Sequence, residues 1–223
     1  THTYAISDHL TALASANASL LTGAASYVSN DSQSDLSALT TSQISGFSNN
    51  IVTTLTPSQL AMLDNTQLGA LTSSQIGALA AAGDLSGLSA AQIGALGADI
   101  IALTATQLAA LNNTQLGGLT DTQVGALGTD GDLASLSGAQ IGAIGNTITG
   151  LTSAQVAALT DAQLIGLTAG QVTALNNAGD LSTLTPYQQG LLNSGSSTTF
   201  TAGVSNGVLS FGGNATGDIT FTV

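Results

Sequence analysis

The stretch from Leu103 to Leu127 reads LTATQLAALNNTQLGGLTDTQVGAL and consists of three copies of one eight-residue phrase. Each copy has a leucine, a small polar residue, two variable residues, a glutamine, an aliphatic residue and two small residues. Related phrases recur from Leu39 to Leu192. This octad therefore determines the fold class of most of the chain.

The octad carries the signals that start a helix. In the copy that begins at Leu71, Thr72 as N-cap places Gln75 at N3, so Thr-x-x-Gln predicts a capping box. Leu71 and Ile76 then occupy the N′ and N4 positions of a hydrophobic staple. Pro57 and Pro186 both fall at N1, where a missing N–H costs least. We therefore expect a series of very short helices, each restarted by its own cap.

The same pairing of a cap and a glutamine recurs along the chain. The glutamines at N3 are Gln43, Gln59, Gln67, Gln75, Gln92, Gln107, Gln115, Gln123, Gln140, Gln155, Gln163, Gln171 and Gln188. The matching N-caps are Thr40, Thr56, Asp64, Thr72, Ser89, Thr104, Asn112, Thr120, Ser137, Thr152, Thr160, Thr168 and Thr185. Every cap is a Thr, Ser, Asp or Asn, the residue types that N-caps favour.

A longer period lies above the octad. Gln59, Gln107 and Gln155 are 48 residues apart, and the irregular step between octads always carries Gly-Asp-Leu. Self-similarity at a fixed period is typical of solenoids, in which each unit buries its apolar face against the next. The predicted fold class is therefore mainly α, a solenoid of very short capped helices (octads within a 48-residue super-repeat), with a small C-terminal β segment.

The composition divides the chain into three parts. Residues 1–35 predict an N-terminal cap segment, with a short strand at Tyr4–Ser7, a helix that runs to about Leu21 and a second strand near Tyr27. Residues 36–192 form the octad-repeat helical solenoid. Residues 193–223 alternate apolar side chains with Thr, Ser and Gly and predict β-strands. The last strand, Ile219–Val223, is expected to leave an open edge that can pair with another chain.

The charge and the missing residue types exclude several functions. The chain has no Lys, Arg, Cys or Glu, and its twelve Asp give a formal net charge of −12. Without basic residues, binding to nucleic acid or to an anionic membrane surface is not expected. No apolar run is long enough for a membrane helix, so no membrane insertion is expected. The absence of Cys excludes disulfides and thiolate metal sites.

The chemical inventory predicts no catalytic site. His2 and His9 are the only histidines, and neither has a metal-ligand spacing. No P-loop, dinucleotide-binding fingerprint, zinc motif or Gly-x-Ser-x-Gly elbow is present. We therefore expect that the protein is not an enzyme and requires no cofactor.

One set of acidic residues is the candidate metal site. Asp84, Asp132 and Asp180 belong to the three Gly-Asp-Leu steps and should form a column along the solenoid. Like charges in a column repel, and calcium, which binds carboxylate and carbonyl oxygens, would relieve that repulsion. In the alternative interpretation each Asp caps a turn after a glycine and the column is solvated. Calcium at contacts between subunits is a further possibility.

The octads support a resemblance to known proteins. LTSSQIGAL at residues 71–79, LTDTQVGAL at 119–127 and LTSAQVAAL at 151–159 resemble the LTxxQ(I/V)xAL octads of bacterial cell-surface proteins, namely large type I-secreted adhesins, RTX-like proteins and surface-layer-like proteins. The N-terminal YAISDHLTALASANASLL is similar to another unit of those proteins. The resemblance implies an extracellular, structural or adhesive role at the bacterial cell surface. The chain lacks the Gly-Gly-x-Gly-x-Asp nonapeptides with which RTX proteins bind calcium.

Three functions remain in view at the level of sequence. The first is a structural subunit of an extracellular assembly (filament, surface layer or biofilm matrix) whose partners are copies of itself and components of the cell surface or matrix. Self-association would use the solenoid surface and the C-terminal strands. The second is a spacer or binding module of a large adhesin. The third, an ice-binding solenoid, ranks last because the threonines are used as N-caps.

Overall fold

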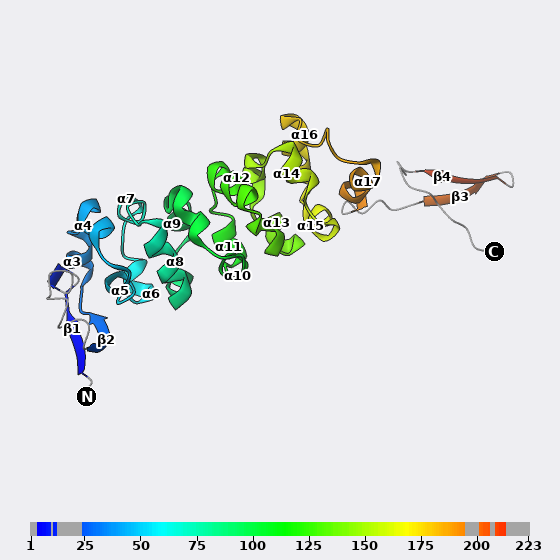
Figure 1. The fold of residues 1–223 in the computed structure, drawn as a ribbon. Helices are drawn as coiled ribbons and strands as arrows, with labels where there is room; N and C mark the ends of the chain where they lie inside the picture. Colours follow the sequence, from blue (N-terminus) through cyan, green and yellow to red (C-terminus); the bar gives the residue numbers. More distant parts are fainter. Residues whose placement is uncertain (1–3, 10, 13–23, 195–200, 206–207, 213–223) are drawn as a thin grey trace.

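The octads build a rod of stacked coils in the computed structural model, which describes residues 4–9, 11–12, 24–194, 201–205 and 208–212. The helical coils run from Gln33 to Ser194, with the first helix, α3, and the last helix, α17, at opposite ends of the rod (Figure 1). The structure thus confirms a mainly helical solenoid. No helix among the described residues combines the length and the apolar character needed to cross a membrane.

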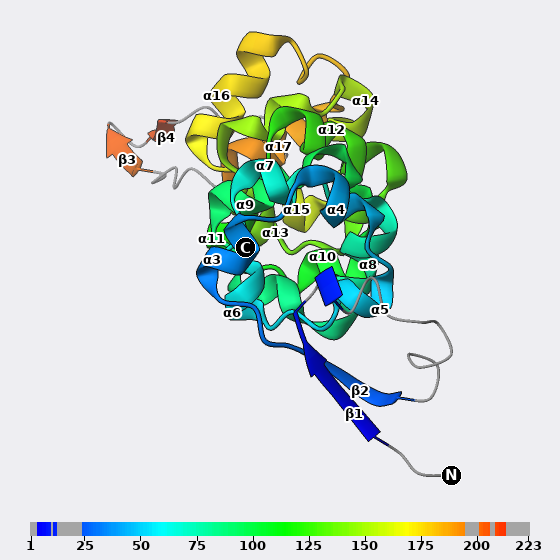
Figure 2. The ribbon, with the colours of Figure 1, turned by 90° about the vertical axis from the view of Figure 1, so that its left-hand side faces the viewer.

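Each coil has three sides, and equivalent sides of successive coils stack along the rod, as the view in Figure 2 shows. The first side holds α3 (Gln33–Ser37), α6 (Pro57–Leu60), η1 (Asp84–Gly87), α10 (Ala105–Ala109), η3 (Asp132–Ser135) and α14 (Ser153–Ala157). The second side holds α4 (Thr41–Gly46), α7 (Asn65–Leu68), α9 (Ala90–Ala95), α11 (Asn113–Leu116), α13 (Gly138–Ala143), α15 (Asp161–Gly166) and α17 (Pro186–Ser194). The third side holds α5 (Asn49–Val52), α8 (Ser73–Ala82), η2 (Gly97–Ala102), α12 (Asp121–Asp130), η4 (Gly145–Gly150) and α16 (Ala169–Ala178).

The length of one coil is half of the 48-residue period. Helices on the second side begin at Thr41, Asn65, Ala90, Asn113, Gly138, Asp161 and Pro186, which places successive coils 23 to 25 residues apart. Three octads therefore complete one coil, and the 48-residue period contains two coils.

The two coils of each period differ in their third side. In one, the third side is a ten-residue helix (α8, α12 or α16) that ends at a glycine with positive φ. These glycines are Gly83, Gly131 and Gly179, with φ of 84° or 85°, a conformation that a side chain with a Cβ rarely adopts. In the next coil, the first and third sides are 3-10 turns instead. The Gly-Asp-Leu step therefore marks the change from one kind of coil to the other.

The capping boxes form as the sequence predicts. At Thr120, the backbone N–H of Gln123 donates to the Thr120 hydroxyl, and the backbone N–H of Thr120 donates to Oε1 of Gln123. Equivalent boxes start the other octad helices from α4 to α16. Each box satisfies two backbone donors that a helix of four to ten residues would otherwise leave unpaired.

The leucines and aliphatic residues of the octads form one continuous core from Leu36 to Leu192. Backbones approach closely beside it, because a Cβ on Gly94, Gly125 or Gly142 would lie 2.7 Å from a carbonyl oxygen of a neighbouring coil. Each coil buries its apolar residues against the next, as in other solenoids.

Two pairs of strands lie outside the coils. β1 (Tyr4–Asp8) and β2 (Ala24–Ser29) pair in parallel, with Ile6 opposite Tyr27. β3 (Thr201–Ser205) and β4 (Val208–Gly212) pair antiparallel. Of the predicted helix up to Leu21, residues 11 and 12 are described and are helical, while residues 13–21 lie outside the described residues. The predicted strand Ile219–Val223 also lies outside them, and a C-terminal β segment over residues 193–223 stays a prediction.

Candidate functional site

The glutamine of each octad has a second function that the capping box does not reveal. Its Oε1 accepts a hydrogen bond within its own helix, which leaves the two hydrogens of Nε2 available. In most octads Nε2 donates to backbone carbonyls of the preceding coil, 26 to 31 residues earlier in the sequence. One side chain therefore starts a helix and joins it to the coil before it.

Gln123 shows the complete arrangement. Its Oε1 accepts from the backbone N–H of Thr120 at 2.9 Å, while Nε2 donates to the carbonyls of Ile93 and Gly97, each at 3.0 Å. The side chain is 0% exposed. A glutamate at this position could accept in the capping box, but it could not donate to the two carbonyls.

Six buried glutamines share this geometry, with both Nε2 hydrogens directed at carbonyls of the preceding coil. They are Gln67, Gln75, Gln115, Gln123, Gln163 and Gln171. We call this set the glutamine ladder. The sequence signal for it was present, because N3 accepts Glu or Gln in a capping box and this chain contains no Glu.

Two octad glutamines make the capping box alone. Gln107 accepts from the backbone N–H of Thr104 at 2.8 Å, and Gln43 accepts from that of Thr40 at 2.9 Å. Within the described part of the chain, neither Nε2 has a hydrogen-bond acceptor. Gln43 belongs to the first coil among the described residues, and no earlier coil is described that could offer it a carbonyl.

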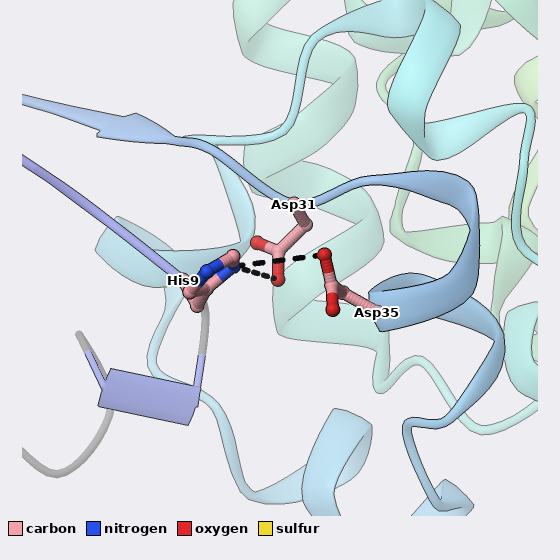
Figure 3. Close-up of side chains that lie close together, drawn as sticks. All are labelled: His9, Asp31 and Asp35. Carbon is pink, nitrogen blue, oxygen red and sulfur yellow. Dashed lines mark ion pairs between the residues drawn. The ribbon is translucent and has the colours of Figure 1, made fainter.

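A separate cluster of ionisable groups lies at the N-terminal end of the rod (Figure 3). His9 follows β1, Asp31 precedes α3 and Asp35 lies within α3. The Nδ1 atom of His9 is 3.4 Å from a carboxylate oxygen of Asp31 and 3.8 Å from one of Asp35. The Asp31 side chain is buried, whereas His9 and Asp35 are about half exposed.

The cluster brings together groups of opposite charge when His9 is protonated. Hydrogen bonds from the Ser32 hydroxyl and backbone N–H lower the pKa of the Asp35 carboxyl, and His9 acts in the same direction. One ligand atom from each of His9, Asp31 and Asp35 can lie within 4.8 Å of the other two. An imidazole with carboxylates suits zinc better than calcium, which prefers oxygen ligands alone. The sequence did not indicate this grouping, because His9 and Asp31 are far apart in the chain.

The predicted calcium residues, Asp84, Asp132 and Asp180, occupy equivalent places on the first side of the rod. Asp84 and Asp132 open the 3-10 turns η1 and η3, and Asp180 follows the glycine that ends α16. Because one coil contains half of the 48-residue period, a complete coil separates each of these residues from the next. The structure therefore does not bring the three carboxylates together, and calcium binding by them stays a prediction.

The three aspartates also differ in their partners. Asp180 accepts a hydrogen bond from the Ser153 hydroxyl at 3.0 Å. Two 48-residue periods earlier, the equivalent residues are Asp84 and Pro57, and the proline side chain has no hydrogen to donate. One carboxylate oxygen of Asp84 is buried with no hydrogen-bond partner. Burial raises the pKa of the Asp84 carboxyl. This aspartate therefore opposes folding when it is ionised.

No family model, no curated protein and no solved structure matches the chain. The resemblance to bacterial surface proteins therefore stays a prediction from the octads. The described residues present a rod with a buried glutamine ladder along its length and a histidine–aspartate cluster at one end. Of these two features, only the glutamine ladder extends through most of the rod.

Proposed function

We propose that the protein is a structural subunit of an extracellular assembly, such as a filament, a surface layer or a biofilm matrix. The observation that carries the proposal is the continuous core together with the glutamine ladder, which run from coil to coil along the rod. Buried hydrogen bonds between neighbouring coils of the ladder resist bending and local opening. A stiff rod of this kind suits a load-bearing or spacing role.

The chain is proposed to join copies of itself through the solenoid surface and through the C-terminal strands. Because the chain has no Lys or Arg, contacts between copies cannot include ion pairs between these residues and Asp, and they must rely on apolar groups and hydrogen bonds. The net charge of −12 repels other copies at low ionic strength. Assembly is therefore expected to increase with salt or with a divalent cation such as calcium.

Electron microscopy of the purified protein tests the proposal. Ordered filaments or sheets in calcium would support it, and their loss after chelation would locate calcium at the contacts between subunits. Removal of residues 218–223 is expected to leave the solenoid folded, as judged by circular dichroism, while it stops assembly through the strands. Unchanged assembly would exclude strand addition as the joining mechanism.

The second candidate is a spacer or binding module of a large bacterial adhesin. The rod shape favours it, because a rod holds a binding tip at a distance from the cell. Sedimentation at high protein concentration, with and without calcium, separates the two candidates. A chain that stays monomeric under all of these conditions would favour the spacer.

A further inference from the structure

The first and last coils of the rod lack contacts that the interior coils make with their neighbours. At the C-terminal end, α16, α17 and the turn between them line an open hollow of about 590 Å³. Val172 and Leu181 line this hollow and are only partly buried. Their equivalents one period earlier, Val124 and Leu133, are 0% and 4% exposed because the next coil covers them. The last coil therefore leaves partly exposed two apolar side chains whose equivalents one period earlier are buried.

The same end presents a carbonyl oxygen with one hydrogen bond fewer than its interior equivalents. The carbonyls of Leu36, Leu85 and Leu133 accept from the ladder glutamines Gln67, Gln115 and Gln163 at 2.7 to 2.9 Å. The equivalent carbonyl of the last coil belongs to Leu181, and it accepts from the backbone N–H of Leu184. Among the described residues, no side-chain donor reaches this oxygen, so its second lone pair is available.

The chain itself does not supply the missing glutamine. The interior donors lie 30 or 31 residues after their leucines, and the residue 30 positions after Leu181 is Phe211 in β4. No glutamine follows Gln189 in the sequence, and no octad follows Leu192. A second copy of the octad repeat can supply a coil that covers this surface.

The first coil holds a glutamine on the second side whose Nε2 has no acceptor in the described part of the chain, and this glutamine, Gln43, is exposed. In the two-coil period Gln43 corresponds to Gln92, Gln140 and Gln188, and each of these donates from Nε2 to a carbonyl on the first side of the preceding coil. Gln43 lines a second hollow, of about 360 Å³, together with Leu39, Ala38 and the His9 cluster. The first coil and the last coil lie at opposite ends of the rod (Figure 1), so they cannot contact each other within one molecule.

From this complementarity we infer that the rods join head to tail, with the first coil of one copy stacked on the last coil of a second copy. In this contact Gln43 Nε2 donates to the Leu181 carbonyl of the second copy, so that a glutamine on the second side joins two coils across the boundary as well. The apolar surface around Val172 and Leu181 is buried by the same contact. A head-to-tail contact does not close on itself unless it curves into a ring, so it produces a filament. This inference rests on the proposed self-assembly and specifies its geometry.

Gln43→Glu tests the contact with little effect on folding, because glutamate at N3 still accepts in the capping box. It removes the donor and places a carboxylate against a carbonyl, so we expect association to weaken about tenfold or more in sedimentation velocity. Gln107→Glu is the matched control: it makes the same change at a glutamine that also lacks an acceptor among the described residues, but in the middle of the rod. The control is expected to assemble as the unaltered protein does.

A mixing experiment tests the direction of the contact. Leu181→Asp blocks the C-terminal end, and circular dichroism verifies that the variant is folded. At protein concentrations between the dissociation constant of the unaltered protein and those of the variants, each variant alone should be monomeric. An equimolar mixture of Gln43→Glu and Leu181→Asp should then form dimers and nothing longer, because each variant keeps one intact end. Dimers of Gln43→Glu alone would show a tail-to-tail contact and overturn the inference.

The remaining outcomes separate this inference from the proposed function. If the unaltered protein assembles and neither substitution weakens assembly, the rods join elsewhere, and the head-to-tail contact is wrong while the structural role stands. If the unaltered protein stays monomeric at all concentrations, both the contact and the proposed assembly are wrong.

Discussion

Gln107 and Gln123 belong to two copies of the same octad, yet they act differently. Both complete a capping box, but Gln123 is fully buried and donates to two carbonyls of the preceding coil, whereas Gln107 has no such acceptor among the described residues. The side of the rod alone does not explain the difference: Gln107 starts a helix on the first side and Gln123 starts one on the third, but Gln59 and Gln155, also on the first side, donate to the preceding coil. The octad thus encodes the start of a helix, and the carbonyls that the preceding coil places near Nε2 decide whether the glutamine also joins two coils.

The largest expected effect comes from the same substitution at these two positions. Gln123→Glu should lower the free energy of unfolding by about 3–5 kcal/mol, because it leaves two carbonyls unpaired and buries a carboxylate with no cation nearby. Gln107→Glu should change it by about 0.5 kcal/mol or less. Urea denaturation followed by circular dichroism measures both. Equal effects at the two positions would contradict the distinction.

A second comparison concerns two glycines, one with backbone atoms of the adjacent coil close to it and one with open space around it. Gly118→Ala places a methyl group into the backbone of Ala90 in the adjacent coil and should cost about 1–3 kcal/mol or more. At Gly46, which ends α4, an added methyl group would have no neighbouring atom within 4 Å, so Gly46→Ala should stabilise the protein by about 0.5–1 kcal/mol. Thermal denaturation of both variants provides the measurement. A stabilised Gly118→Ala would show that neighbouring coils are not closely packed.

The N-caps separate the capping function from the joining function. Thr104→Ala removes a cap that serves only its own helix and should cost about 1 kcal/mol. Thr120→Ala should cost more, because the Thr120 hydroxyl also donates to Oε1 of Gln123 and helps to orient its amide. If Thr104→Ala proved the more damaging of the two in urea denaturation, the cap at Thr120 would have no role in orienting Gln123.

The smallest expected effect concerns pH. Because burial raises the folded-state pKa of Asp84, its ionisation opposes folding, and the cost is absent at low pH and complete above that pKa. Asp84→Asn should therefore stabilise the protein at neutral pH, and the gain should shrink as the pH falls through the folded-state pKa. Asp180→Asn is the control, since Asp180 accepts from Ser153. A gain that does not depend on pH would exclude ionisation as the cause.

Much of this fold follows from the sequence, because its signals are local. Thr72 and Gln75 are three residues apart, so the capping box can be read directly, and the fixed period indicates a solenoid. The number of octads in a coil could not be read, since it depends on how helices pack between coils that are distant in the chain. For the same reason the spacing of Asp84, Asp132 and Asp180 suggested a tighter column than the structure contains.

The candidate sites were less predictable than the fold. The amide of Gln123 meets carbonyls from a coil whose position the sequence does not specify, although the complete absence of Glu indicated that a donor was needed at N3. His9 and Asp31 approach each other through the pairing of β1 with β2, which brings distant segments together. Long-range contacts of this kind require the structure.

The most direct test of the glutamine ladder is hydrogen exchange of side-chain amides, observed by ¹H–¹⁵N NMR and assigned with single Gln→Glu variants. We predict that the Nε2 hydrogens of Gln67, Gln75, Gln115, Gln123, Gln163 and Gln171 exchange slowly, while those of Gln107 exchange as rapidly as in a free glutamine. Rapid exchange at all of these positions would show that the glutamines do not join the coils, and would contradict the central claim that the ladder holds the rod together.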